Sequence, residues 1–258
     1  MPADSDSPRE AADDRVAAAR AAVASNSTWY HTMELAPGVV TPGYVDLRAV
    51  AERVLPDDLS GRRCVDIGTF DGFWAFEMER RGGTVVATDV EKIDDAEWPP
   101  HRREELRRGQ AEYDVRLGRG FELASAALGS AVERVVCNIY ELAPERVGGE
   151  VDFAFIGALL LHLRDPVRGL ERTRETLRAG GELRVFEPYS RAVGLRSRRP
   201  AARFLPLETS FNWWVPNLAG LEAWLRVAGF QAPRRLGTVR PPARPEMRQR
   251  YATLAASR

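Results

Sequence analysis

Short apolar runs alternate with amphipathic stretches over most of the chain that follows Gly61. The runs typical of buried strands are Cys64–Ile67, Thr84–Thr88, Val132–Cys137, Val151–Ile156, Leu183–Phe186 and Tyr251–Ala256. Helical periodicity marks residues 73–81, 121–128 and 218–228, together with a stretch that begins at Pro166. This alternation predicts an α/β fold in which helices cover both faces of a mainly parallel sheet.

Capping residues place the ends of the two helices in the second half of the chain. Asp165 is a side-chain cap in front of Pro166, a residue favoured at the first helical position, and Gly180-Gly181 is expected to end that helix. Asn217 is the matching cap of the later helix, and Gly229 is expected to stop it. Both helices therefore have predicted boundaries.

The first 60 residues lack this alternation and predict an N-terminal tail and helical cap, followed by a domain over residues 61–258. We expect disorder over residues 1–8, a helix over 9–25, turns at Pro37-Gly38 and Thr41-Pro42-Gly43, and a short helix that Asp46 caps. Residues 91–131 are longer than one helix requires and predict an excursion over the surface before the helix at 121–128.

Composition restricts the partners and the compartment. Of the 258 residues, 44% are hydrophobic and 29% charged, and the formal net charge is zero, so no general attraction to nucleic acid or an anionic membrane is indicated. No apolar run is long enough to span a bilayer, and the polar start does not resemble a signal peptide, so we expect a cytoplasmic protein. Cys64 and Cys137 lie in apolar runs, and their spacing suggests neither a metal site nor a disulfide framework.

The loop after the first predicted strand favours a particular nucleotide ligand. A dinucleotide fingerprint that begins at Gly68 requires glycine at positions 70 and 73, where this chain has Phe70 and Phe73. The second glycine of that fingerprint lets the backbone approach a pyrophosphate, which a phenyl side chain disfavours. The loop therefore suits an adenosine ligand without phosphates and argues against a nicotinamide-dependent oxidoreductase.

The following strands end in residues that suit the rest of such a ligand. Asp89 ends the second strand, where a carboxylate can accept both ribose hydroxyls. Asn138, after the third strand, can pair with the amino edge of adenine, and Val90 and Ile139 can enclose the ring. Backbone carbonyls around Ile156 can receive an α-ammonium group.

The segments Val65–Gly72, Val151–Pro166 and Leu177–Leu183, together with Asp89, resemble the motifs of class I S-adenosylmethionine (SAM) dependent methyltransferases. Phe70 departs from the family, which usually has a second glycine there. The resemblance covers about residues 61–258 and implies SAM as the cofactor. It also implies a Rossmann-like, doubly wound, mainly parallel seven-stranded sheet with an antiparallel last strand. The cofactor-binding residues it implies are Asp66, Gly68, Thr69, Phe70, Gly72, Asp89, Val90, Asn138, Ile139 and Ile156.

Within that family, the segment from Trp29 to Gly83 resembles the tRNA wobble-uridine (mo5U34) methyltransferases. The sequence is therefore compatible with two classes of methyl acceptor. Our leading hypothesis is a small-molecule acceptor, as in natural product biosynthesis. Methylation of tRNA is the alternative, and a run of arginines supports it: Arg191, Arg196, Arg198, Arg199 and Arg203. The same arginines can hold a phosphate or carboxylate of a small substrate. A non-catalytic SAM-binding protein is a third hypothesis, and both a monomer and a homodimer stay open.

Two of the three histidines are candidate catalytic residues. His162 lies just past the fourth strand, where it either removes a proton from the acceptor or orders a neighbouring loop. His31 stands beside Trp29 and Tyr30, in a segment that either closes over the cofactor or packs the cap onto the core. His101, in the charged excursion, is expected on the surface.

The candidate substrate contacts lie in the cap and around the fifth strand. Glu187 and Tyr189 follow that strand, and Asn212 and Trp213 belong to an aromatic segment before the next helix. Aromatic walls with one amide suit a small, partly apolar acceptor, although core packing explains the tryptophans equally well. With Trp29 and Tyr30 of the cap, six residues are thus candidate substrate contacts.

Overall fold

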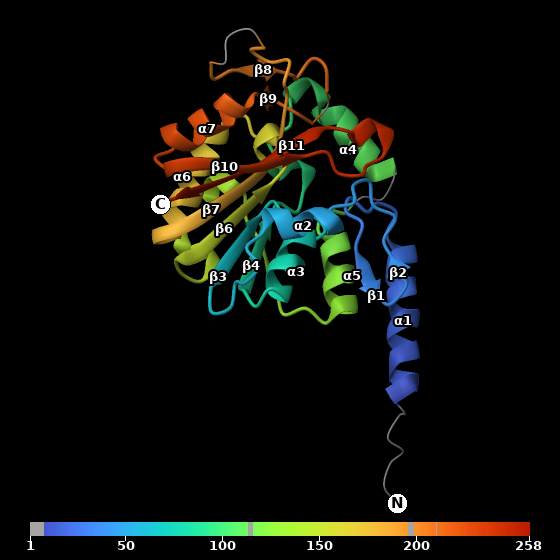
Figure 1. Ribbon diagram of the computed structural model, residues 1–258. Helices are drawn as coiled ribbons and strands as arrows, with labels where there is room; N and C mark the ends of the chain where they lie inside the picture. The colour runs from blue at the N-terminus through green and yellow to red at the C-terminus, as the bar shows by residue number, and fades with distance from the viewer. Residues whose placement is uncertain (1–7, 113–115, 196–198, 210) are drawn as a thin grey trace, which may run out of the picture.

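The computed structural model describes residues 8–112, 116–195, 199–209 and 211–258, and it contains a twisted seven-stranded sheet (Figure 1). In spatial order the strands are β10 (Gln231–Val239), β11 (Arg250–Ser257), β7 (Leu177–Tyr189), β6 (Val151–Gly157), β3 (Arg63–Ile67), β4 (Thr84–Asp89) and β5 (Glu133–Val136). β3 pairs in parallel with β4 and β6, whereas β11 runs antiparallel to both β7 and β10. The predicted fold class is confirmed, including the antiparallel last strand.

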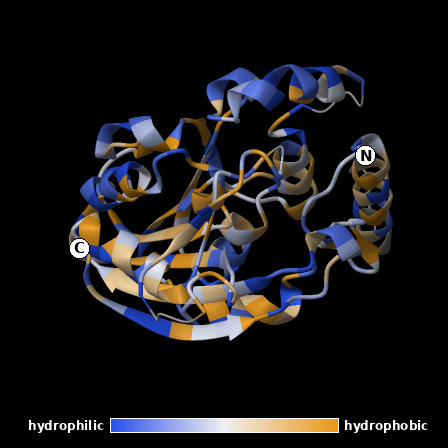
Figure 2. Cartoon of the chain, turned by 90° about the horizontal axis from the view of Figure 1, so that it is seen from above, coloured by the Kyte–Doolittle hydropathy of each residue, from blue (hydrophilic) through white to orange (hydrophobic). Residues whose placement is uncertain are grey.

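Helices cover both faces of the sheet because its central strands are apolar on both sides. On β6, Phe153 and Phe155 belong to one apolar core, and the alternate residues Ala154 and Ile156 belong to the other. The first core also contains residues of α2 (Arg48–Val54), α3 (Phe73–Arg80) and α5 (Arg119–Leu128), and the second those of α6 (Pro166–Thr176) and α7 (Leu218–Val227). Figure 2 shows the same arrangement, with hydrophobic residues along the sheet and hydrophilic residues on the outer sides of the helices.

The predicted starts of the two helices in the second half of the chain are confirmed, but one of their predicted ends is wrong. Asp165 accepts a hydrogen bond from the Arg168 N–H, and Asn217 accepts one from the Gly220 N–H, so both side chains cap as expected. α6 ends at Thr176 rather than at Gly180-Gly181, because Leu177 is already extended and pairs with Val151 in the sheet. The glycines instead lie inside β7, where Gly180 has a positive φ of 74°.

The N-terminal part contains a hairpin that the sequence pattern does not reveal. α1 (Pro8–Ser25) agrees with the predicted helix, while the expected disorder over residues 1–8 falls almost wholly outside the described residues. The turn at Pro37-Gly38 joins β1 (Glu34–Ala36) to β2 (Val39–Val40). The short helix begins after Leu47, and Asp46 is not its capping residue; the Asp46 carboxylate instead accepts from the Arg48 N–H and binds the Arg48 guanidinium.

The connections at the carboxyl ends of the parallel strands carry further elements. Between β4 and β5 lie η1 (Ile93–Asp95), η2 (Pro100–Arg102) and α4 (Arg103–Glu112), which precede α5. The other short elements are η3 (Ile139–Glu141), η4 (Pro144–Val147), η5 (Leu160–His162), β8 (Ala202–Phe204), β9 (Trp214–Pro216) and η6 (Pro245–Met247). The β8–β9 hairpin stands at the top of Figure 1. His101 is exposed and both cysteines are buried and free, as predicted.

Candidate cofactor and acceptor site

The loop that follows β3 is held in a tight, partly left-handed conformation. The N–H groups of Gly68 and Thr69 donate to the Thr88 carbonyl at 2.8 and 3.1 Å, which fixes the loop to β4. Gly72 has a φ of 92°, and a Cβ there would lie 2.4 Å from the Phe76 ring, so glycine is required. Phe70 also has a positive φ, 51°, which is costly for a bulky residue. Its N–H donates to the Asp89 carboxylate at 2.7 Å, and this bond helps hold the strained backbone.

Two buried polar atoms, one near the end of β3 and one in the loop that follows, lack hydrogen-bond partners among the described residues. They are Oδ2 of Asp66 and Oγ1 of Thr69, in residues that are 1% and 2% exposed. Buried polar atoms are rarely left unpaired, so these two fit a ligand that brings hydrogen-bond donors. Burial raises the pKa of Asp66 to about 7, and a cation beside it would restore the ionised form. An ammonium group, as in SAM, fits both observations.

Asp89 lies at the end of β4, as predicted, and its two oxygens hold the neighbouring backbone. One accepts from the Phe70 N–H and the other from the Val90 N–H, both at 2.7 Å. Burial is the main cause that raises the pKa of this carboxyl, and the two N–H donors oppose it. Each carboxylate oxygen can accept a further hydrogen bond, which a ribose hydroxyl would supply.

The side chain of Asn138 is already engaged at the end of β5. Its Oδ1 accepts from the Tyr140 N–H at 3.0 Å, and its Nδ2 donates to the Asp95 carbonyl at 2.6 Å. Asn138 therefore ties η1 to η3. Ile139 is buried beside it, and Val90 is half-buried on the neighbouring strand end. Ile156 has a fully buried side chain, so only its backbone can serve a ligand.

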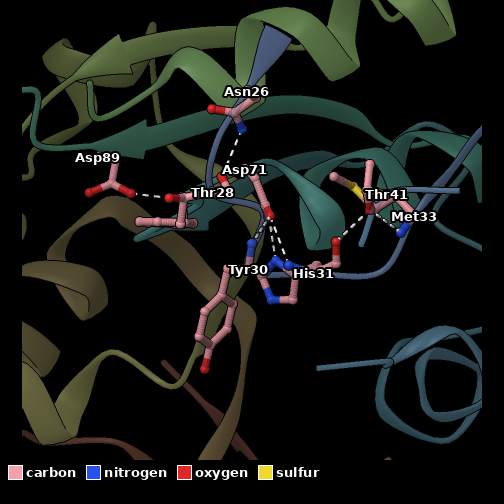
Figure 3. Close-up of polar contacts among 9 residues, drawn as sticks. Asn26, Thr28, Tyr30, His31, Met33, Thr41, Asp71 and Asp89 are labelled. Atoms are coloured by element: carbon pink, nitrogen blue, oxygen red, sulfur yellow. Dashed lines mark hydrogen bonds and ion pairs between the residues drawn. The ribbon is translucent and has the colours of Figure 1, made fainter. Parts of the chain in front are cut away.

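The N-terminal segment is fastened to this loop by Asp71 (Figure 3). One oxygen of the Asp71 carboxylate accepts from the N–H groups of Tyr30 and His31, at 3.0 and 2.8 Å, and the other binds Nδ1 of the His31 ring. The His31 ring also stacks on Phe73, with ring centroids 5.3 Å apart. Trp29 is 2% exposed and donates to the Val23 carbonyl, so its ring packs the cap onto the core.

Tyr30 extends from this segment toward the last strand. Its phenol lies beside the phenol of Tyr251, which accepts from Nε2 of Gln249 at 3.2 Å. Burial raises the pKa of both tyrosines, so both stay protonated at neutral pH. Neither Asp71 nor Tyr251 was a candidate from the sequence. Asp71 lies inside the glycine-containing loop and could have been found there, whereas Tyr251 gave no signal beyond the start of a strand.

The structure fixes the tautomer of His162. Nδ1 lies 2.8 Å from the carbonyl oxygen of Phe211, and because a carbonyl only accepts, Nδ1 carries the proton. Burial lowers the pKa of this imidazole, so it is neutral at pH 7 and its Nε2 has a free lone pair for a proton. The same hydrogen bond orders the loop at Phe211, so the geometry suits either predicted role.

Glu187 anchors the turn that carries His162. Its carboxylate accepts from the N–H groups of Leu159 and Leu160 at 2.7 and 2.8 Å, and it is 1% exposed. Burial raises the pKa of this carboxyl to about 8, against the opposing effect of those donors. Glu187 is thus placed below the turn rather than in an open cavity.

A cavity of about 450 Å³ opens at the end of β7, beside β9. Its lining residues are Leu161, Pro188, Tyr189, Ser190, Arg191, Ala192, Arg203, Leu205, Asn212, Trp214, Val215, Gln249 and Arg250. Two of the predicted substrate contacts, Tyr189 and Asn212, line it. Trp213 does not: its ring is buried and donates to the Glu97 carbonyl, while the adjacent Trp214 faces the cavity.

Solved structures that are similar to this chain include methyltransferases that use SAM. A SAM-dependent methyltransferase from Mesorhizobium loti aligns over 82% of this chain and 97% of its own length, with a TM-score of 0.51 and 16% identity. A phosphoethanolamine N-methyltransferase from Haemonchus contortus aligns over 81% of this chain and 51% of its own, with a TM-score of 0.52 and 14% identity. The chain therefore has the class I SAM-dependent methyltransferase fold.

The curated relatives that the sequence matches include distant ones. A tRNA U34 carboxymethyltransferase of Pseudomonas aeruginosa is 28% identical over 185 residues, which are 71% of this chain. This chain spans 49% of that relative's length, about half. A ubiquinone biosynthesis O-methyltransferase of Xanthomonas euvesicatoria is 28% identical over 178 residues, 67% of this chain and 64% of the relative. No family model matches the sequence.

Proposed function

We propose that this protein is a methyltransferase that binds SAM over β3, β4 and β6 and methylates a small molecule held in the neighbouring cavity. The observation that carries the proposal is the adjacency of the two sites. β6 pairs with β7, and the Ala158 N–H donates to the Phe186 carbonyl, so the end of the cofactor strand adjoins the strand that leads into the cavity. A volume of about 450 Å³ is in the range of small-molecule sites.

The residues have distinct parts in this proposal. Asp66 and Thr69 supply the unpaired acceptors for the ammonium group, and Asp89 supplies acceptors for the ribose. When bound, SAM brings an activated methyl group, so the protein's main contribution is to align the acceptor with it. His162 can hold the acceptor's proton on Nε2, because Nδ1 is occupied and burial keeps the ring neutral.

The first 60 residues act in this proposal as a lid that is fixed in place. Tyr30 and His31 are bound to Asp71 of the cofactor loop, and aromatic packing joins His31 to Phe73. Such a cover keeps water away from the transferred methyl group. The two units, residues 1–60 and 61–258, would therefore share one site.

The experiment is calorimetric titration with S-adenosylhomocysteine and, separately, with NAD⁺, followed by methyl transfer from labelled SAM. We expect S-adenosylhomocysteine to bind and NAD⁺ not to bind, and label to enter the small-molecule fraction of a cell extract. Binding without any transfer would assign a non-catalytic SAM-binding role. Failure to bind S-adenosylhomocysteine would overturn the proposal.

Methylation of tRNA is the second candidate, and the similarity to tRNA U34 carboxymethyltransferases favours it. The formal net charge of zero argues against it, because RNA binding relies on excess positive charge. Arg196 and Arg198, which belong to the predicted arginine cluster, lie outside the described residues. Label that enters a tRNA transcript rather than the small-molecule fraction would establish this candidate.

A further inference from the structure

The cavity at the end of β7 is lined by more positive than negative side chains. Three of its lining residues are arginines, Arg191, Arg203 and Arg250, and no aspartate or glutamate in the described part of the chain lines it. Among the described residues, Arg203 pairs with Glu208 at 3.3 Å, whereas no carboxylate pairs with Arg191 or Arg250. The guanidinium groups around this cavity therefore exceed the acids that neutralise them.

The arginines come from three separate parts of the chain. Arg191 follows β7, Arg203 belongs to β8, and Arg250 begins β11, where it pairs with Tyr189 in the sheet. On the β8–β9 hairpin, Arg203 and Leu205 both line the cavity, and Arg203 lies opposite Val215 of β9. A run of consecutive arginines would indicate a solvated surface; convergence from separate elements on one cavity indicates a binding site.

Apart from Ser190, Asn212 and Gln249, the remaining walls are apolar or aromatic. Leu161, Leu205 and Val215 supply aliphatic surface, and Tyr189 and Trp214 supply rings. The hairpin also leaves Phe204 half exposed, with its ring 5.3 Å from that of Trp214. The cavity thus combines apolar surface with guanidinium groups that carry excess positive charge.

We infer that the methyl acceptor is an amphiphilic small molecule whose aromatic or aliphatic body carries a carboxylate or phosphate. A guanidinium binds either anion through paired hydrogen bonds, which explains why arginine suits this site. The apolar walls would hold the body of the acceptor, and its anionic end would meet Arg191 and Arg250. This inference rests on the proposed function and names the class of its acceptor.

The test is binding of matched probes by calorimetry, in the presence of saturating S-adenosylhomocysteine. The first pair is 3-phenylpropionate and its amide, and the second is phenyl phosphate and phenol. We expect each anion to bind at least tenfold more tightly than its neutral partner. Arg191→Gln and Arg250→Gln should each weaken anion binding by about 10- to 100-fold and leave the neutral probes unaffected.

Arg226→Gln is the matched control, because Arg226 is exposed on α7 outside the cavity. Its anion affinity should equal that of the unmodified protein. Arg191→Glu should reverse the preference and favour 3-phenylpropylamine, an effect that a merely structural role of the arginine would not produce. The affinity for S-adenosylhomocysteine should stay constant in all of these variants, which shows that the cofactor site is intact.

The outcomes separate this inference from the proposed function. If S-adenosylhomocysteine binds but the anions have no advantage over their neutral partners, or if neither anion binds, the inference is overturned and the methyltransferase proposal stands. Equal losses in Arg226→Gln also overturn it. A tRNA transcript that competes with the anionic probes, with an affinity that falls steeply as salt rises, would assign the arginines to RNA instead. Failure of S-adenosylhomocysteine itself to bind counts against the proposed function.

Discussion

Three carboxyl groups at the carboxyl edge of the sheet share one property, a pKa that burial raises. They belong to Asp66, Asp89 and Glu187. The raised pKa values indicate that the fold places these groups where ionisation is disfavoured and where a ligand with donors or positive charge compensates. Backbone N–H groups already serve Asp89 and Glu187, while Asp66 keeps an unpaired oxygen. Of the three carboxyl groups, that of Asp66 would therefore be stabilised most by a ligand that donates a hydrogen bond.

Replacement of Asp89 by alanine should weaken S-adenosylhomocysteine binding by about 100-fold, because two charge-assisted hydrogen bonds to the ribose would be lost. Asp89→Asn keeps one acceptor oxygen and should lose less. Calorimetry measures both affinities, and circular dichroism checks that the loop change has not unfolded the chain. An unchanged dissociation constant for Asp89→Ala would remove Asp89 from the cofactor site.

His162→Gln should lower kcat by about 100-fold and leave the affinity for S-adenosylhomocysteine nearly unchanged, because a general base acts only on the acceptor. Since burial lowers the pKa of His162, the base form dominates at pH 7. In the unmodified protein, kcat should therefore fall only below about pH 6.5, as the imidazole becomes protonated. His101→Gln, on the exposed excursion, is the control. Full activity of His162→Gln from pH 5.5 to 8 would leave only the loop-ordering role.

At the scale of single elements, the turn η5 depends on a strand beside it. Two N–H groups at the start of this turn donate to Glu187 at the end of β7, and the turn then carries His162. A turn that points polar backbone groups into the interior needs an internal acceptor. Glu187 supplies that acceptor, which makes it a positioning residue for His162.

Glu187→Gln should change how stability depends on pH. The folded-state pKa of Glu187, about 8, is above its unfolded value, so its contribution to stability is fully present below about pH 4.5 and is lost as pH rises toward 8. Glutamine keeps an acceptor and does not ionise. The melting temperature of Glu187→Gln should therefore exceed that of the unmodified protein at pH 8 by several degrees, with the difference vanishing near pH 5.

Glu145→Gln makes the same chemical change at an exposed position of η4 and should show no such pH-dependent difference. A difference for Glu187→Gln that does not vary between pH 5 and pH 8 would contradict the raised pKa. Loss of kcat in Glu187→Gln, with the pH profile of His162 displaced, would support its positioning role.

Elements with strong local signals were predictable from the sequence, and those fixed by long-range pairing were not. Asp165 and Asn217 mark helix starts because a cap is a local interaction. Leu177 continues the helical apolar pattern, but pairing with Val151 draws it into β7. β10 was missed because it lies at the edge of the sheet, where most of its residues are exposed and no alternation of apolar and polar residues marks it.

The same distinction applies to the site. The ends of β3, β4 and β5 were predictable because parallel strands bring their carboxyl ends to one edge, which placed Asp66, Asp89 and Asn138 correctly in the fold. The cavity was predictable only in part, since which of Trp213 and Trp214 faces it depends on the β8–β9 hairpin. The contact between Tyr30 and Tyr251 joins two distant segments and had no local signal.

At the scale of the whole molecule, the N-terminal part and the sheet form one continuous core. Trp29, Leu35 and Val50 belong to the same apolar cluster as Phe73 and Phe155. The cap is therefore packed onto the domain by apolar contacts, and the polar contacts of Asp71 set its position.

No described helix has both the length and the apolar character needed to cross a membrane.

Asp71→Asn should loosen the cap without unfolding the sheet. Its buried carboxylate serves two backbone N–H groups and the His31 ring, so the change should cost about 3 kcal/mol. Hydrogen exchange should become faster at Tyr30 and His31 but not in β3 or β6. Asp46→Asn, at a more exposed position of the N-terminal segment that contains Tyr30 and His31, should leave exchange unchanged. Uniform acceleration across the sheet would instead show that Asp71 supports the entire fold.

The cap is also bound from the opposite end of the sequence, and this has a consequence for how the protein is made. The Asp46 N–H donates to the Pro242 carbonyl, and the Arg244 guanidinium donates to the Pro42 carbonyl across 202 positions of the chain. Residues 30–46 are therefore synthesised long before Pro242 and Arg244, with which they form hydrogen bonds. Contacts between residues so far apart in the sequence form slowly. Until β11, which begins at Arg250, has emerged from the ribosome, Tyr30 lacks its neighbour Tyr251. A nascent chain can thus complete the centre of its sheet early, while the contacts that fix its N-terminal cap form only after translation has passed this strand.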